Sequence, residues 1–307
     1  MLLGLCSCTQ EPEPPAKPEE KSIEVSESTL RQWLDSSVGM WEFAQRFLDD
    51  TIIYKSKLGT WAFADVDDSL PKSNYNWDNL RHAGPIANTE WEYYEEGQLK
   101  SIKGIDVSQY NTITDWDAVK KSGVEFVMLR TGYRGYTKGG LVEDKKFKEN
   151  AAAAAKAGIN LGVYFVTQAI NVQEAIEEAD WVVGLMKETG LNFTWPVALD
   201  LEDAGSLEAR TVDLRVEERT EIIIAFCERI KEYGYKPMLY SAIRWYLEEM
   251  DLSQLTEYNK WFAQYFNRPF FPYEFQVWQY TSSGKVDGIS GNVDLNLCML
   301  NFAAKDE

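Results

Sequence analysis

The chain has 307 residues, of which 45% are hydrophobic and 13% aromatic, so it can bury the core of one large domain or two smaller ones. Its formal net charge of −18 argues against nucleic-acid binding, which depends on basic patches. Because His82 is the only histidine, a His-rich metal centre is excluded and a Ser-His-Asp triad is disfavoured. The sequence has neither a Cys-x-x-Cys pair for zinc nor a glycine-rich phosphate loop after a predicted strand.

The first 28 residues predict export and a membrane anchor. "MLLGLCSC" resembles the end of a signal peptide, and its "LCSC" resembles a bacterial lipoprotein box in which Cys8 is lipidated. An ordinary signal-peptide fragment is the alternative interpretation. Residues 9–28 hold four Pro and six Glu and too little apolar surface to fold, which predicts a disordered linker.

Residues 29–100 are predicted to form a small α+β leader region. The leader is expected to begin with an amphipathic helix from Ser28 or Thr29, followed by one or two strands over residues 51–67. A short hairpin is expected over residues 90–102, with its turn at Glu96-Gly97. The sequence assigns no task to this region, and an interaction module for an envelope partner is one possibility.

From Gly104 onward, predicted strands and helices alternate. Each of the first four strands is followed by a helix, and the helices shorten after Ser241. Thr114 is expected to cap the first helix, and Gly123 and Gly158 are expected to end the first two. Three closing strands follow. The predicted strands cover residues 104–108, 124–132, 159–168, 195–203, 236–241, 258–266, 275–288 and 292–299, and the helices cover residues 114–123, 144–158, 171–190 and 213–234. This order predicts an α/β fold, an irregular TIM-like barrel of about 200 residues, rather than a doubly wound sheet.

Two further cysteines lie in this second part of the chain. Cys227 falls on a predicted helix face and Cys298 in an apolar segment near the end. Both are predicted to be buried thiols, although an exported protein could also pair them.

The fourth predicted strand, "PVALDLEDAG", places Asp200 two residues before Glu202. In a strand, such residues point to the same side with Cα atoms roughly 6.5–7 Å apart, so their charges repel and at least one pKa rises. A solvated strand end is the ordinary explanation of this pattern. The alternative is an acid paired with a stabilising anion, as in glycoside hydrolysis.

Four segments together resemble glycoside hydrolase family 25, the N-acetylmuramidases or lysozymes of the Chalaropsis type. The resemblance covers about residues 102–303, and its motifs occur in the expected order. The segments are "GIDVSQYNTITDWDAVKKSGVEFVMLRTGYRGY", "AGINLGVYFVTQA", "PVALDLED" and "WQYTSSGKVDGISGNVDLN". The resemblance implies a barrel of five βα units and three further strands, a (β/α)5(β)3 fold, over residues 101–307, after the 1–28 and 29–100 regions.

The resemblance also implies roles for individual residues. Glu202 would be the general acid and Asp200 the stabilising carboxylate, with Asp106 and Asp294 completing an acidic groove at the carboxyl end of the barrel. Gln109 stands where the family often has histidine. Residues expected to contact substrate are Tyr164, Tyr240, Trp261, Tyr133 and Gln279.

The implied reaction is cleavage of the β-1,4 bond between N-acetylmuramic acid and N-acetylglucosamine in peptidoglycan, without a metal or organic cofactor. The expected partners are glycan strands and, through Cys8, a membrane, which places the protein in the cell envelope. Two rivals are a non-catalytic peptidoglycan-binding protein on the same barrel and a chitinase-like glycosidase. The sequence does not decide between inversion and retention through the 2-acetamido group.

Overall fold

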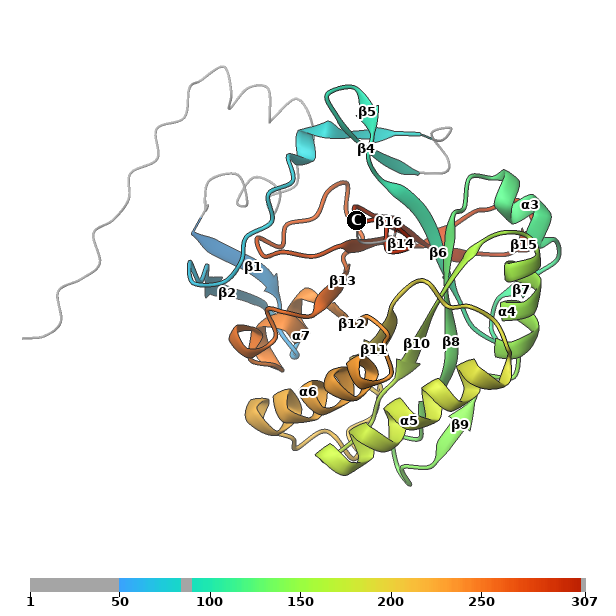
Figure 1. Ribbon diagram of the computed structural model, residues 1–307. Coiled ribbons are helices and arrows are strands. Elements are labelled where there is room, and N and C mark those ends of the chain that lie inside the picture. The colour runs from blue at the N-terminus through green and yellow to red at the C-terminus, as the bar shows by residue number, and fades with distance from the viewer. Residues whose placement is uncertain (1–49, 84–89, 305–307) are drawn as a thin grey trace, which may run out of the picture. The chain divides into compact units, whose positions relative to one another are not determined.

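The computed structural model describes residues 50–83 and 90–304 (Figure 1). The expected lipoprotein box, the linker and the helix beginning near residue 29 lie outside these ranges. The chain divides into two units, and the second runs from Asp50 to Glu307. Residues 50–100 therefore fall in the same unit as the barrel.

A nine-stranded sheet dominates the part of the chain that the structure describes, and it closes on itself because β8 and β10 also pair (Figure 1). With β9 set aside as an edge strand on β8, the others form the barrel. The strands are β6 (Ile102–Val107), β8 (Phe126–Arg134), β9 (Leu141–Glu143), β10 (Asn160–Val166), β11 (Val197–Asp200), β12 (Pro237–Ala242), β13 (Asn259–Ala263), β14 (Val277–Gly284) and β16 (Val293–Cys298). The barrel agrees with the predicted order of five βα units and three closing strands.

Strand direction determines which residues reach the mouth of the barrel. From β6 through β14, neighbouring barrel strands are parallel, so their carboxyl ends meet at one end. The last strand, β16, runs antiparallel to both β14 and β6 and brings its first residues to that same end.

Helices cover the outside of the barrel, and α5 and α6 lie side by side (Figure 1). They are α3 (Trp116–Lys121), α4 (Phe147–Lys156), α5 (Val172–Glu188), α6 (Val216–Glu232) and α7 (Ile243–Glu248). Gly123 and Gly158, at φ of +87° and +74°, follow the ends of α3 and α4 as predicted, because glycine tolerates this left-handed conformation. The expected cap Thr114 is wrong by one residue: the Asp115 carboxylate accepts hydrogen bonds from two backbone N–H groups of the first turn of α3.

Two apolar layers hold the barrel together. The outer layer packs the helices against the strands and buries one side of α5, formed by Ala175, Ala179, Val182, Val183 and Met186. The inner layer fills the barrel below its mouth, where Phe126 and Trp195 stack with ring centroids 3.8 Å apart. Because this layer plugs the interior, only the end formed by the strand carboxyl termini is available as a site.

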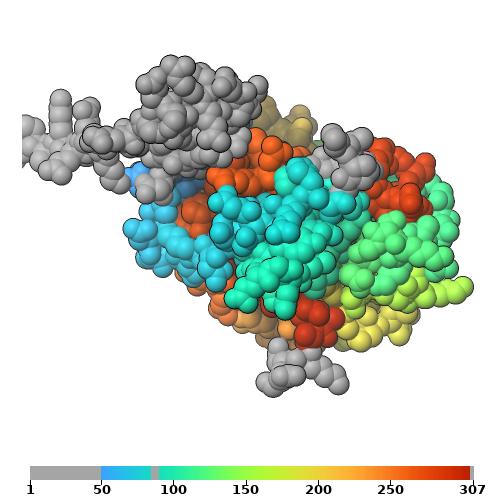
Figure 2. All heavy atoms as spheres, turned by 90° about the horizontal axis from the view of Figure 1, so that it is seen from above, coloured from blue at the N-terminus to red at the C-terminus, as the bar shows by residue number. Residues whose placement is uncertain are grey.

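Residues 50–100 form small antiparallel sheets beside the closing strands. The strands are β1 (Thr51–Lys55), β2 (Trp61–Asp65), β3 (Leu80–His82), β4 (Trp91–Glu95) and β5 (Gln98–Leu99), with η1 (Trp77–Asn79) between β2 and β3. The predicted turn at Glu96-Gly97 is confirmed, with positive φ at both residues. Trp77 stacks on Phe275 with ring centroids 5.6 Å apart, and Figure 2 shows this blue-to-cyan region gathered beside orange and red segments.

The remaining short elements complete the fold. They are β7 (Thr112–Ile113) and β15 (Ile289–Ser290), which pair with each other, and η2 (Leu252–Gln254). Cys227 and Cys298 are buried free thiols, which confirms the first of the two expectations for them. None of the helices within residues 50–83 and 90–304 is long and apolar enough to cross a membrane.

Candidate active site

The mouth of the barrel is lined by alternate residues of its strands. Side chains that point inward at the carboxyl ends form a hollow of about 220 Å³. All four carboxylates named from the sequence line it, and so do four of the five expected substrate contacts. The lining residues are Asp106, Arg130, Tyr164, Val166, Asp200, Glu202, Tyr240, Trp261, Tyr265, Gln279 and Asp294.

Asp106 is the centre of a buried hydrogen-bond network. Its Oδ2 accepts bonds from Gln279 Nε2 at 2.9 Å and from Asn296 Nδ2 at 2.8 Å. The two amide oxygens accept in turn: Gln279 from the Tyr240 hydroxyl at 2.8 Å, and Asn296 from the Trp261 indole N–H at 2.7 Å. Burial, followed by the charge of Asp294, raises the pKa of Asp106 well above its usual value, while the two amides oppose the rise.

Asp294 lies directly opposite Asp106 in the pairing of β16 with β6. Its pKa is raised to about 6, chiefly because burial disfavours the charged form. The two carboxyls therefore lie beside each other at the rim, and ionisation of Asp294 adds negative potential that raises the pKa of Asp106.

Asp200 and Glu202 lie at the end of the fourth barrel strand. Asp200 is the last residue of β11 and is 4% exposed, whereas Glu202 follows the strand and is exposed. The strand spacing expected of the pair therefore stops at Asp200, although both residues line the same hollow. Burial and then the charge of Glu202 raise the pKa of Asp200 well above its ordinary value, and Asp200 Oδ1 has no hydrogen-bond partner.

The pKa of Glu202 is raised, which favours the protonated form of its carboxyl. Low solvation inside the groove raises its pKa; the positive charge of Arg130 opposes the rise, and the charges of Asp203 and Asp294 add to it. Glu202 also lines two neighbouring hollows, of about 230 and 360 Å³, and so lies where three hollows meet. A substrate that extends along this surface would pass the Glu202 carboxyl.

Arg130 was not identified from the sequence. It projects from β8, and its Nε bonds Asp144 Oδ2 at 2.8 Å, while its buried Nη2 has no partner. Its guanidinium lies 5.1 Å from the ring centre of Tyr110 and 5.8 Å from that of Tyr133. The signal available in advance was a charged residue directly after the apolar run Phe126–Leu129 of the predicted strand "VEFVMLRTG".

The aromatic residues expected to contact substrate differ in their exposure. Tyr164 and Tyr240 are partly exposed in the hollow, and Tyr133 lines the neighbouring 360 Å³ hollow beside Arg130. Trp261, at 1% exposed, and Gln279, at 2%, are buried. Trp261 packs edge-on against Tyr240 and bonds Asn296, so its geometry is that of a support for the site rather than of a surface on which a sugar could stack.

Gln109, which stands where the family often has histidine, contacts Asp144 and is not among the residues that line the hollow at the barrel mouth. Its backbone N–H donates to Asp144 at 2.9 Å, and its side chain accepts from the Lys145 N–H at 3.5 Å. No group of three or more His, Cys, Asp or Glu side chains among the described residues is placed to hold a metal ion.

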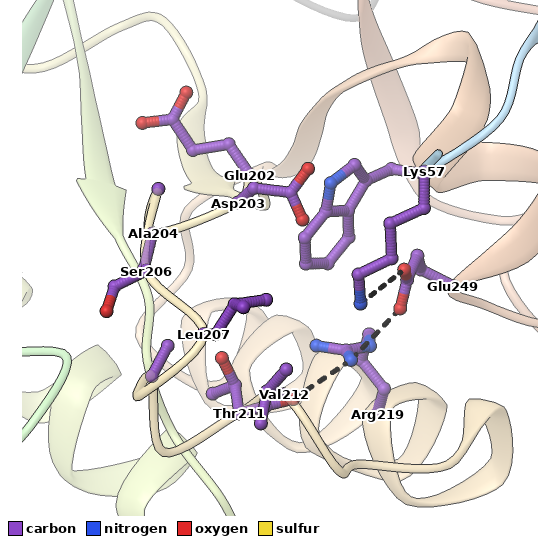
Figure 3. Close-up of a pocket in the computed structure, with 13 residues that line it drawn as sticks. Lys57, Glu202, Asp203, Ala204, Ser206, Leu207, Thr211, Val212, Arg219 and Glu249 are labelled. Carbon is purple, nitrogen blue, oxygen red and sulfur yellow. Dashed lines mark hydrogen bonds and ion pairs between the residues drawn. The ribbon is translucent and has the colours of Figure 1, made fainter. Parts of the chain in front are cut away.

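Figure 3 shows the residues that line the hollow of about 230 Å³, which shares Glu202 with the hollow at the barrel mouth. The loop from Asp203 to Leu207 forms one side of it, and Arg219 and Glu249 lie on the other. Asp203 pairs with Arg244, which ties this loop to α7.

Comparisons with known proteins identify the class to which this barrel belongs. The model of the protein family described as "Glycosyl hydrolases family 25" matches residues 105–289 of the chain. That match spans more than half of the chain, so the protein belongs to glycosyl hydrolase family 25 and is a glycoside hydrolase.

Individual relatives cover the same part of the chain. The chain is 27% identical over 206 residues to the uncharacterized protein YegX of Escherichia coli K12, covering 64% of this chain and 69% of YegX. It is 26% identical over 196 residues to the autolytic lysozyme of Clostridium acetobutylicum, covering 64% of this chain and 55% of that relative.

Among solved structures, the modular autolysin LytC of Streptococcus pneumoniae superposes with a TM-score of 0.57 at 24% identity. The superposition covers 82% of this chain and 57% of LytC, so it spans little more than half of that protein. At this identity the likeness supports the fold alone.

Proposed function

We propose that the protein is a lysozyme that cleaves the β-1,4 bond between N-acetylmuramic acid and N-acetylglucosamine in peptidoglycan, with Glu202 as the general acid. Membership of family 25 and the autolytic lysozyme among its relatives support hydrolysis of peptidoglycan. The pneumococcal autolysin has also been solved with a synthetic peptidoglycan ligand. The observation that carries the proposal is the convergence of Glu202 with three buried or half-buried aspartates at the barrel mouth.

The raised pKa of Glu202 matches the work of a general acid. A raised pKa favours the protonated carboxyl, which can donate its proton to the glycosidic oxygen as the bond to the anomeric carbon breaks. The leaving sugar departs with that proton as a free hydroxyl, and water completes the hydrolysis at the anomeric carbon.

Whichever of the aspartates is ionised supplies negative charge where positive charge develops. As the glycosidic bond breaks, the sugar ring becomes oxocarbenium-like, and Asp200 and Asp106 lie in the same hollow as Glu202. The amides of Gln279 and Asn296 hold the carboxylate of Asp106 in one orientation, so little reorganisation is needed during the reaction.

The two rival functions differ from a lysozyme in the residues that they require and in the products that they release. A binding protein on the same barrel needs neither the buried carboxylates nor the raised pKa of Glu202, both of which cost stability. A chitinase-like enzyme would cleave between N-acetylglucosamine residues and leave alternating glycan strands intact.

The decisive experiment is digestion of purified peptidoglycan, followed by identification of the new reducing ends by reduction and mass spectrometry. Reducing ends of muramic acid support the proposal. Reducing ends of glucosamine would make the protein a glucosaminidase, and release of no fragments would favour the binding module.

The substrate lies outside the cytoplasm, so the protein acts as an exported or envelope protein. We further propose that Cys8 carries the lipid anchor and that residues 9–28 tether the enzyme at a distance from the membrane surface. The support is the "LCSC" segment and the Pro- and Glu-rich composition that follows it.

A further inference from the structure

One of the side chains that line the hollow beside Glu202 comes from outside the residues that the family model matches. Lys57, in the turn between β1 and β2, lines this hollow of about 230 Å³ together with Glu202 and Arg219 (Figure 3). The family match begins only at residue 105, so the segment that carries Lys57 lies upstream of it. The β1–β2 hairpin therefore adds a charged side chain to a surface that adjoins the general acid.

Lys57 is weakly held in its present position. Its Nζ lies 3.7 Å from Glu249 Oε1, and its side chain is 47% exposed. Glu249 is already bonded by Arg244 at 2.8 Å and by Arg219 at 3.1 Å. Lys57 can therefore turn to another anion without leaving the Glu249 carboxylate unpaired.

Arg219 offers a second cation to the same space. Its side chain is 5% exposed, and its buried Nε has no hydrogen-bond partner. Figure 3 shows Lys57 and Arg219 reaching Glu249 from different sides, with Thr211 and Val212 next to Arg219. The hollow thus combines two cations and three carboxylates with hydroxyl groups and apolar surface. The carboxylates are those of Glu202, Asp203 and Glu249, and the apolar surface comes from Leu207, Val212 and Trp245.

This chemistry suits a short peptide better than a neutral sugar ring. A peptide carries carboxylates, amide or amino N–H groups and small apolar side chains, which can pair with cations, carboxylates and apolar surface in one hollow. In peptidoglycan such peptides branch from the muramoyl ring, which adjoins the bond to be cut. We propose, on the basis of the proposed function, that this hollow binds the peptide stem of the substrate and that Lys57 pairs with one of its carboxylates.

The competing explanation is structural: Lys57 merely ties the hairpin to α7 through Glu249. A structural role would affect every substrate equally, because loosening the hairpin does not depend on whether the glycan carries peptides. A role in peptide recognition changes the ratio of kcat/KM for peptide-bearing glycan to that for glycan stripped of its stems by an amidase.

The test measures that ratio for Lys57→Ala and Lys57→Glu in the full chain. Loss of one charge-assisted hydrogen bond predicts a fall of about tenfold for Lys57→Ala, mostly in KM, and a larger fall for Lys57→Glu. The matched control is Lys55→Ala in the same hairpin, since the Lys55 ammonium packs over Trp61 and does not line the hollow. The control should keep the wild-type ratio.

Two results would overturn the inference. An unchanged ratio for both Lys57 variants shows that the hollow does not recognise the peptide, and a ratio that falls equally in Lys55→Ala assigns the effect to the hairpin as a whole. If the wild-type enzyme cleaves neither substrate, the proposed function itself fails, which is a different outcome from an enzyme that cleaves both without preference.

Discussion

Asp106 and Asp294 are direct cross-strand partners in the antiparallel pairing of β6 with β16. Like charges placed opposite each other in a sheet are destabilising. Here burial adds to the cost, because it raises the pKa of Asp106 well above its usual value and that of Asp294 to about 6. This pair of aspartates therefore lowers the stability of the fold at the barrel mouth, as is expected where ionisable groups take part in catalysis.

The raised pKa of Asp294 means that its ionised carboxylate destabilises the fold, which leads to a prediction for Asp294→Asn. A carboxyl whose folded-state pKa is raised binds its proton more tightly in the folded state. The stability that this protonated carboxyl contributes is fully present below about pH 4 and is lost as the pH rises through about 6. At pH 7.5 the neutral amide should stabilise the fold by about 1–3 kcal/mol, which raises Tm by several degrees. At pH 4 the gain should vanish.

Thermal unfolding of both proteins at the two pH values checks this prediction. Asp287→Asn, at an exposed aspartate in the β14–β15 connection, is the matched control and should change Tm little at either pH. An Asp294→Asn variant no more stable than wild type at pH 7.5 would contradict the unfavourable charge pair.

Replacement of Glu202 by glutamine should abolish hydrolysis while the protein stays folded. Glutamine keeps the shape of the side chain but cannot donate the proton, and general acid catalysis is worth roughly 10²–10⁴ in rate. Release of reducing ends from peptidoglycan measures the loss. Glu208→Gln, in the same loop but lining none of the three hollows around Glu202, should retain wild-type activity. Activity of Glu202→Gln within about tenfold of wild type would remove Glu202 from this role.

The barrel was predictable because its signals are local. Apolar strands alternate with amphipathic helices, and glycines end α3 and α4, so the element order follows from periodicity alone. The cap of α3 was misplaced because Thr114 and Asp115 are adjacent and both suit that position; the structure selects the aspartate.

The site was only partly predictable because much of it depends on distant pairings. The four carboxylates were identified through motifs, but the Gln279 and Asn296 amides meet at Asp106 only after β14, β16 and β6 have paired. Lys57 reaches its hollow through the packing of the β1–β2 hairpin near α7, for which a single sequence carries no signal. Burial likewise decides that Trp261 supports the network instead of facing solvent.

Replacement of Arg130 by glutamine should shift the high-pH limb of the activity profile to higher pH. Burial raises the pKa of Glu202, and the positive charge of Arg130 holds that rise back. Without this charge Glu202 keeps its proton to a higher pH, and a general acid stays active as long as it is protonated. Glutamine can still donate a hydrogen bond to the buried Asp144, which protects the fold.

The measurement is kcat/KM on peptidoglycan across pH for the wild type, for Arg130→Gln and for a control variant. Arg81→Gln, at an exposed arginine that packs on Tyr94, is the control and should leave the profile in place. A limb that stays fixed or moves to lower pH in Arg130→Gln would show that Arg130 does not set the protonation of the acid. The apparent values belong to the coupled carboxylates together, so the direction of movement is the readout.

Replacement of Cys8 by alanine should release the protein from the membrane fraction. The expectation rests on "LCSC", in which Cys8 holds the lipidated position, and on the Pro- and Glu-rich segment that follows. A single acyl chain binds membranes only marginally, so stable attachment requires more than one chain on Cys8. Cys6→Ala, two residues earlier in the same segment, is the matched control and should remain bound. Fractionation followed by immunodetection measures both variants. If the Cys8→Ala protein is exported and stays with the membrane, the lipid anchor is refuted and attachment must come from elsewhere in the chain. If both variants are released, apolar contact of the segment, rather than lipid on one cysteine, holds the protein.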